Sequence, residues 1–92
     1  MKLILSKVND TLRFKRPYTF HIEEDLGLLI LEDPVLCLTI YAEDIKSLEK
    51  DLISELVFSW EYYALESDEK LTQQAKQLKS NLLDNLMPSK TK

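Results

Sequence analysis

Side chains that could do chemistry are few in this sequence, and they are scattered. The single histidine, His21, precedes a run of carboxylates at Glu23, Glu24 and Asp25. A histidine beside carboxylates has the residue types of a general base or of part of a metal site. No further ligands follow at metal-binding spacing. The group therefore also fits an exposed strand face that leads into a polar turn.

The single cysteine, Cys37, lies between Leu36 and Leu38 and has no basic neighbour that would favour the reactive thiolate. It would serve as a nucleophile only if the fold placed His21 beside it as a base. One cysteine cannot form a disulfide within the chain, and a cysteine in an apolar strand packs as a small hydrophobe. We therefore expect Cys37 to be part of the core.

Other catalytic motifs are missing. A chain whose only glycine is Gly27 cannot form a glycine-rich phosphate loop or a serine nucleophile elbow. The remaining acidic residues gather at expected strand ends and at a helix start, where turn and capping roles explain them. We predict a protein that is not an enzyme and has no catalytic residue, cofactor or metal site. A small metal-dependent hydrolase or nuclease is the weakest of the alternatives.

The first half of the chain reads as strands. Residues 2–8 and 11–14, separated by Asn9-Asp10, predict a hairpin that Pro17 interrupts. Residues 18–24 alternate between apolar and polar, which is typical of a half-buried strand. The runs 28–31 and 35–41 are apolar on both faces, so we expect these strands to be covered on both sides.

The second half reads as helices. A period of 3.6 predicts a helix from an N-cap at Asp44 to about Glu66. Its broad apolar stripe consists of Ile45, Leu48, Leu52, Leu56, Trp60 and Tyr63, flanked by Ile53, Val57 and Ala64. Thr72 is the expected N-cap of a second helix that ends at Met87-Pro88. Its coiled-coil-like seam consists of Leu71, Ala75, Leu78, Leu82 and Leu86.

These elements predict a single α+β domain over residues 1–88, with residues 89–92 as a disordered tail. The expected architecture is an antiparallel β-meander of four or five strands packed by one long helix, followed by a C-terminal helix. A length of 92 residues allows one core of marginal stability, which association with a partner or a second copy would support.

Three apolar residues do not fit the stripe of the long helix. Phe58, Tyr62 and Leu65 project from roughly its opposite side. A soluble helix seldom exposes such a line to water. We predict these three as the partner-binding residues, unless the C-terminal helix covers them.

The charge balance bears on partners and location. The net charge of −4 disfavours nucleic acid as a partner. The segment 13–16, with Lys2 and Lys7, could form one basic edge, and it equally fits charged side chains that protect an exposed strand from pairing. No stretch is long enough for a signal peptide or membrane span, so we expect a cytoplasmic protein without membrane contact.

The central stretch resembles a known family. Gly27 precedes an apolar strand, the segment 34–37 (Pro-Val-Leu-Cys) precedes another, and residues 45–52 open the long helix. In this order they resemble the HicB-type antitoxin domain over Tyr18 to Tyr63. The resemblance implies a β-meander plus helix, a partial ribonuclease-H-like arrangement without that enzyme's activity. It also implies binding to a small partner toxin that cleaves RNA. The residues after Trp60 are similar to a stand-alone bacterial branch without an evident DNA-binding segment.

The sequence thus favours a non-catalytic protein–protein interaction module. The expected partner is a small basic toxin, and self-association into a homo-oligomer is also expected. A structural homo-oligomer is the alternative.

Overall fold

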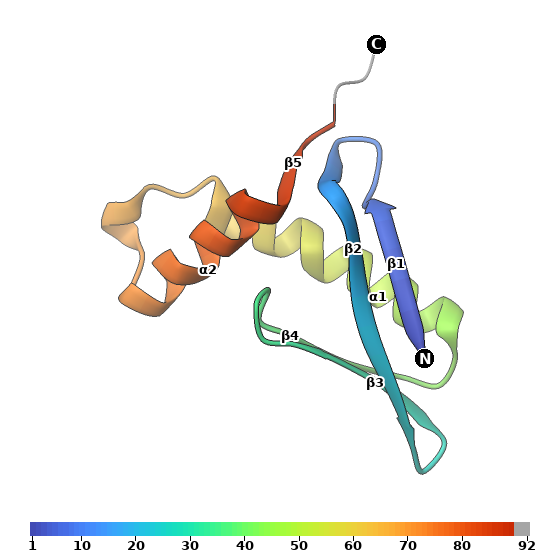
Figure 1. Ribbon diagram of the computed structural model, residues 1–92. Coiled ribbons are helices and arrows are strands. Elements are labelled where there is room, and N and C mark those ends of the chain that lie inside the picture. Colours follow the sequence, from blue (N-terminus) through green and yellow to red (C-terminus); the bar gives the residue numbers. More distant parts are fainter. Residues whose placement is uncertain (90–92) are drawn as a thin grey trace.

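An antiparallel sheet and two helices make up the fold in the computed structural model, which describes residues 1–89 (Figure 1). The elements are β1 (Lys2–Lys7), β2 (Leu12–Asp25), β3 (Leu28–Asp33), β4 (Leu38–Ala42), α1 (Ile45–Ser59), the π-helix η1 (Trp60–Ala64), the 3₁₀ helix η2 (Asp68–Lys70), α2 (Gln73–Asn85) and β5 (Leu86–Pro88). Strands β1 to β4 are neighbours in chain order, and β5 pairs with β2. The predicted α+β meander with a long helix and a C-terminal helix is confirmed. Within residues 1–89, none of the helices combines the length and apolarity needed to cross a bilayer.

The core lies on one side of the sheet. Helix α1 crosses behind the strands (Figure 1). The inward-facing residues of β3, Leu29 and Leu31, are buried, whereas Leu28 is exposed and Ile30 is only partly buried. The expectation that residues 28–31 are covered on both sides was therefore wrong, because Leu28 and Ile30 on the other face of the strand remain open to solvent. A run of four hydrophobic residues predicts a strand that is buried on both faces, even when only alternate residues pack in the core.

Strand β2 runs through Pro17 without ending. On β1 the pairs Leu5–Tyr18 and Lys7–Arg13 are separated by one residue, whereas on β2 they are separated by four, residues 14–17. Proline has no N–H to donate to a ladder, and here it lies in this bulge, outside the regular pairing. The predicted interruption of the hairpin at Pro17 is therefore a bulge within one long strand.

The segment after β3 also differs from the prediction. Strand β4 begins only at Leu38, and the preceding residues 34–37 form a turn instead of strand. Cys37 lies in that turn, is exposed and adopts a positive φ of 55°. Its expected place in the core was wrong. Asp33 is the cause, because its buried carboxylate accepts a hydrogen bond from the Leu36 amide at 3.0 Å and fixes the turn.

The long helix begins as predicted and ends differently. The Asp44 side chain accepts from the Ser47 amide at 2.8 Å, which is an N-cap. The capping bonds hold the pKa of Asp44 below its usual range. The α-helix ends at Ser59 and continues as a π-helix, in which the Leu65 amide donates to the Trp60 carbonyl at 3.1 Å. Ile45, which was expected in the apolar stripe, is exposed.

The C-terminal helix has its predicted N-cap and part of its predicted seam, since Leu71 precedes the helix and Ala75 is only partly buried. The Thr72 hydroxyl accepts from the Ala75 amide at 3.1 Å. Leu78, Leu82 and Leu86 are buried, but Leu86 belongs to a strand instead of the helix. The helix does not reach Met87-Pro88, because residues 86–88 pair with β2. The predicted tail, residues 89–92, falls mostly outside the described residues, although the Ser89 amide donates to the Thr11 carbonyl at 2.9 Å.

Candidate protein-binding surface

The line of Phe58, Tyr62 and Leu65 is exposed in the folded chain. The exposed fractions of these residues are 48%, 62% and 65%. The rings of Phe58 and Tyr62 stack, with centroids 4.5 Å apart and planes inclined by 21°. Helix α2 therefore leaves this line open to solvent. Stacking limits the motion of both rings before any partner arrives, which lowers the entropy cost of binding them.

The position of this line follows from the two faces of the long helix. Leu48, Leu52 and Leu56 are fully buried against the sheet and form the inner face. Helix α2 packs instead against η1, at the far end of α1. The connection between the two helices is held by the Lys79 ammonium, which donates to the Glu66 carbonyl at 2.6 Å and to the Asp68 carboxylate at 2.8 Å. The sheet covers the inner face of α1, and α2 packs on η1 without covering Tyr62, so Phe58, Tyr62 and Leu65 remain exposed.

A hollow of about 190 Å³ lies beside Leu65, between the end of the long helix and the β1–β2 hairpin. Its lining residues are Asn9, Thr11, Leu12, Val57, Trp60, Glu61 and Leu65. The hairpin rim is fixed, because the Asn9 side-chain oxygen accepts from the Thr11 amide at 2.9 Å and from the Leu12 amide at 2.8 Å. The exposed line thus adjoins a concave site with a rigid rim, which suits an apolar side chain of a partner.

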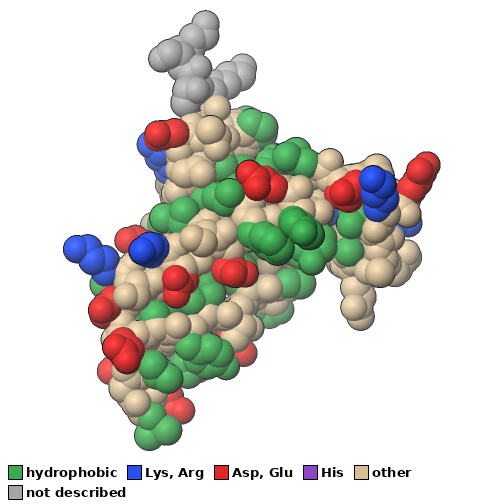
Figure 2. Space-filling model, turned by 180° about the vertical axis from the view of Figure 1, so that it is seen from behind, with side chains coloured by type: hydrophobic (Ala, Val, Ile, Leu, Met, Phe, Trp, Pro, Cys, Tyr) green, Lys and Arg blue, Asp and Glu red, His purple; other side chains and the backbone are tan. Residues whose placement is uncertain are grey.

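The surroundings of this surface are acidic. Residues 51–69 contain six Asp and Glu side chains and no Lys or Arg. Figure 2, which views the molecule from the side of α1, shows hydrophobic side chains grouped on this face, with acidic side chains among and around them and a few basic side chains toward the edges. One of the six, Asp68, is paired with Lys79, which holds its pKa below the usual range and offsets its charge, so five carboxylates within residues 51–69 are without an ion pair. The surface is therefore an apolar centre within a negatively charged rim.

The residues considered for catalysis are not assembled into a site. His21 is exposed on the outer face of the sheet, opposite Lys2 of β1. It shares a shallow hollow with Glu23, Ile30 and Glu32, whereas Cys37 lines a separate one. Among residues 1–89, no group of three His, Cys, Asp or Glu side chains is arranged to hold a metal ion. The geometry gives neither a Cys–His pair nor a metal centre.

The hollow beside Leu65 was missed in the sequence. Asn9 and Thr11 are far from the helix in sequence, and their polar types indicated only a turn. Trp60 was expected in the apolar stripe of the long helix and Val57 on its flank; both pack against the core, but they are only half-buried and also line the hollow. No local pattern could have found this site, because it depends on how the hairpin approaches the helix.

Comparisons of the chain with protein-family models, with curated proteins and with solved structures give no match.

Proposed function

We propose that this protein is a non-catalytic protein-binding module, and that Phe58, Tyr62 and Leu65 are the centre of its partner-binding surface. The observation that carries the proposal is the stacked and exposed Phe58–Tyr62 pair. Small domains seldom leave such an aromatic group exposed beside a concave site without a partner. Aromatic side chains in this setting dominate the energy of protein–protein interfaces.

The charge of the rim indicates the kind of partner. Five of the six carboxylates of residues 51–69 have no ion pair, and they attract a protein that has Lys or Arg around an apolar side chain. A small basic protein fits this requirement. The resemblance of Tyr18 to Tyr63 to the HicB-type antitoxin domain supports the same choice, since members of that family bind small toxins. The protein is then an antitoxin-like module, and its partner is a small basic toxin.

Self-association through the same surface is the second candidate, and the exposed patch favours it as much as it favours a foreign partner. The charge argues against it. A symmetric pair would place the same acidic rim of both copies face to face, and like charges across an interface cost several kcal/mol. Light scattering on the wild type and on Phe58→Asp tests this candidate. A wild-type dimer that Phe58→Asp converts to a monomer would establish it.

Co-purification tests the proposed partner. The tagged protein is co-expressed with the product of the adjacent reading frame, and we expect a stable complex with a small basic protein. Phe58→Asp and Tyr62→Asp should each weaken it at least about 30-fold, which is the effect of losing an interface hot spot of about 2 kcal/mol.

The matched control for these variants is Leu26→Asp, which adds the same charge at another exposed apolar position. Leu26 is 95% exposed, lies in the turn between β2 and β3, and does not line the hollow beside Leu65. This variant should bind as the wild type does. An equal loss in Leu26→Asp would show that Phe58 and Tyr62 are not at the interface, and the absence of any complex with a basic neighbour would end the antitoxin-like proposal.

A further inference from the structure

The charges of the chain are segregated along its sequence. Residues 1–20 contain five basic and one acidic side chain, and residues 70–92 contain the same numbers. Residues 21–69 contain two basic and fourteen acidic side chains. The net charge of −4 is therefore an average over two basic terminal segments and one strongly acidic middle segment. An expectation drawn from the average does not apply to each surface separately.

The tertiary structure places the end of the chain beside the first basic segment, although Lys70, Lys76 and Lys79 do not line the hollow described below. Strand β5, at the end of the chain, pairs with the beginning of β2, where Arg13 is opposite Met87 (Figure 1). The Ser89 amide continues this contact by donating to the Thr11 carbonyl. Lys90 and Lys92 follow in the sequence and lie outside the described residues.

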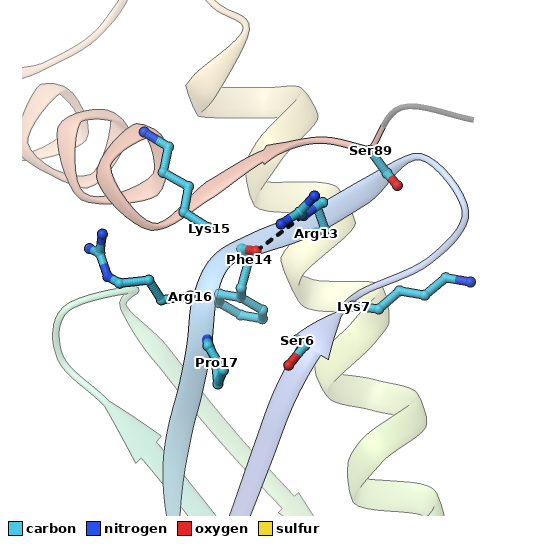
Figure 3. Close-up of a pocket in the computed structure, with 8 residues that line it drawn as sticks. All are labelled: Ser6, Lys7, Arg13, Phe14, Lys15, Arg16, Pro17 and Ser89. Carbon is cyan, nitrogen blue, oxygen red and sulfur yellow. Dashed lines mark hydrogen bonds between the residues drawn. The ribbon is translucent and has the colours of Figure 1, made fainter. Parts of the chain in front are cut away.

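A hollow of about 300 Å³ lies at this junction. Its charged lining residues are Lys7, Arg13, Lys15 and Arg16, and no Asp or Glu contributes to it. Figure 3 shows Lys15 and Arg16 extending to one side of β2, and Lys7 to the other. The bulge at residues 14–17 produces this arrangement, because four consecutive residues face one residue of β1 and their side chains spread apart.

Most of these cations are not used within the fold. In the described part of the chain, the ion pairs are Lys7 with Asp10 and Lys79 with Asp68. Arg13, Lys15 and Arg16 take part in neither, and Arg13 only donates from Nε to the Phe14 carbonyl at 3.4 Å. The three side chains are exposed. They contribute no ion pair to stability and remain available to an external anion.

We infer that this basic hollow binds the phosphate backbone of duplex nucleic acid without reading its sequence. Cations spread over an open surface match a row of phosphates better than they match a single anion. The other polar groups of the hollow, the hydroxyls of Ser6 and Ser89, are also of the kind that contact phosphate oxygens.

Two alternatives fit the hollow less well. A protein partner would need an apolar anchor, but Phe14 is only 1% exposed and the remaining apolar lining residue is Pro17. Single-stranded nucleic acid is held mainly by stacking on aromatic rings. The one aromatic ring of the lining, Phe14, is buried and cannot stack on a base. Backbone contact with a duplex needs only the cations and hydroxyls that are present.

Fluorescence anisotropy with a labelled 20-base-pair duplex tests the inference. Binding should weaken on the order of 100-fold between 50 and 200 mM salt, as expected for three to four phosphate contacts. Arg13→Gln/Lys15→Gln/Arg16→Gln should weaken binding at 50 mM salt at least tenfold. It should also reduce the log–log salt slope by about 3, close to one for each lost contact. The melting temperature of each variant confirms that it is folded.

The control is Lys46→Gln/Lys50→Gln/Lys70→Gln, which removes the same charge from exposed positions outside the hollow. It should retain binding within twofold. Equal losses in both triple variants would show a net-charge effect and overturn the inference, as would no binding at 50 mM salt. Tighter binding to a single strand, or equal competition by polyglutamate, would also overturn it. Phe58→Asp should bind the duplex normally, so this result is independent of the proposed protein partner.

Discussion

The hydroxyl of Tyr18 donates a hydrogen bond to the Asp33 carboxylate, with oxygen–oxygen distances of 2.8 and 3.1 Å. Asp33 is buried and also accepts from the Leu36 amide at 3.0 Å. One carboxylate thus joins β2, the end of β3 and the turn before β4. A buried charge requires such bonds, since each one left unmade costs free energy.

Tyr18→Phe removes one of the partners of Asp33. The variant should lose about 1–3 kcal/mol in the free energy of unfolding, because a buried acceptor is left short of a donor. Urea denaturation measures this change. Tyr41→Phe, a hydroxyl removed from an exposed ring, should change stability by less than about 0.5 kcal/mol. Equal small effects in both variants would show that the Tyr18–Asp33 bond does not stabilise the fold.

Ionisation of Tyr18 should make the protein less stable at alkaline pH. Burial raises the pKa of Tyr18 well above its usual range, and the hydrogen bond and negative charge of Asp33 raise it further. The unfolded chain releases this proton first, near the ordinary tyrosine pKa of about 10. The free energy of unfolding should therefore fall as the pH rises above about 10. Denaturation between pH 8 and 11 measures the fall, which should be shallower in Tyr18→Phe than in the wild type.

The β2–β3 turn is strained at Leu26. Leu26 and Gly27 both have positive φ, 52° and 81°, and Leu26 is 95% exposed, so it packs on nothing. Two-residue hairpin turns of this kind favour Asn-Gly. Leu26→Asn should raise the free energy of unfolding by up to about 1 kcal/mol, since asparagine tolerates this conformation better than leucine does.

Gly27→Ala, in the same turn, should destabilise the fold, whereas Leu26→Asn should stabilise it. A Cβ at this position would meet no atom within 4 Å, so any loss of stability comes from the backbone conformation alone. The expected loss is about 1–2 kcal/mol. Urea denaturation measures the free energy of unfolding of both variants. If Gly27→Ala were as stable as the wild type or more stable, the backbone of this turn would not be strained.

The two faces of the long helix should respond differently to truncation. Leu56→Ala removes a fully buried side chain and should cost about 2–5 kcal/mol. Leu65→Ala removes a side chain that is 65% exposed and should cost less than about 0.5 kcal/mol in the isolated protein. If Leu65→Ala destabilised the free protein as strongly as Leu56→Ala does, the outer face would serve the fold instead of a partner.

The thiol of Cys37 should react in the native protein. It is exposed in a turn and makes only a long contact of 3.8 Å to the Pro34 carbonyl. Ellman's reagent without denaturant should therefore modify one thiol per chain, at a rate close to that in 6 M guanidinium chloride. If the thiol reacted only after unfolding, Cys37 would be buried in the native protein and the exposed turn would be contradicted.

The sequence by itself determined the elements that depend on local chemistry. Both N-caps, Asp44 and Thr72, were predicted, because a cap needs only one side chain and the next three residues. The alternation of residues 18–24 gave the correct buried face of β2. The period of the long helix separated its buried face from Phe58, Tyr62 and Leu65.

What the sequence did not predict depends on contacts between distant segments. Cys37 was placed in a strand because its neighbours are apolar, but the turn is held by Asp33, whose role requires a buried carboxylate with partners from other elements. The short strand at Leu86 forms only because β2 offers it an unpaired edge.

Tertiary structure decided whether the two candidate surfaces stay uncovered. The line of Phe58, Tyr62 and Leu65 is exposed because α2 packs on η1 without covering Tyr62. The cations of the basic hollow all come from residues 7–16, where the bulge in β2 separates their side chains, and the end of the chain adds Ser89 to the lining. Periodicity and capping act over a few residues, whereas a surface is made by whichever segments the fold brings together and leaves uncovered.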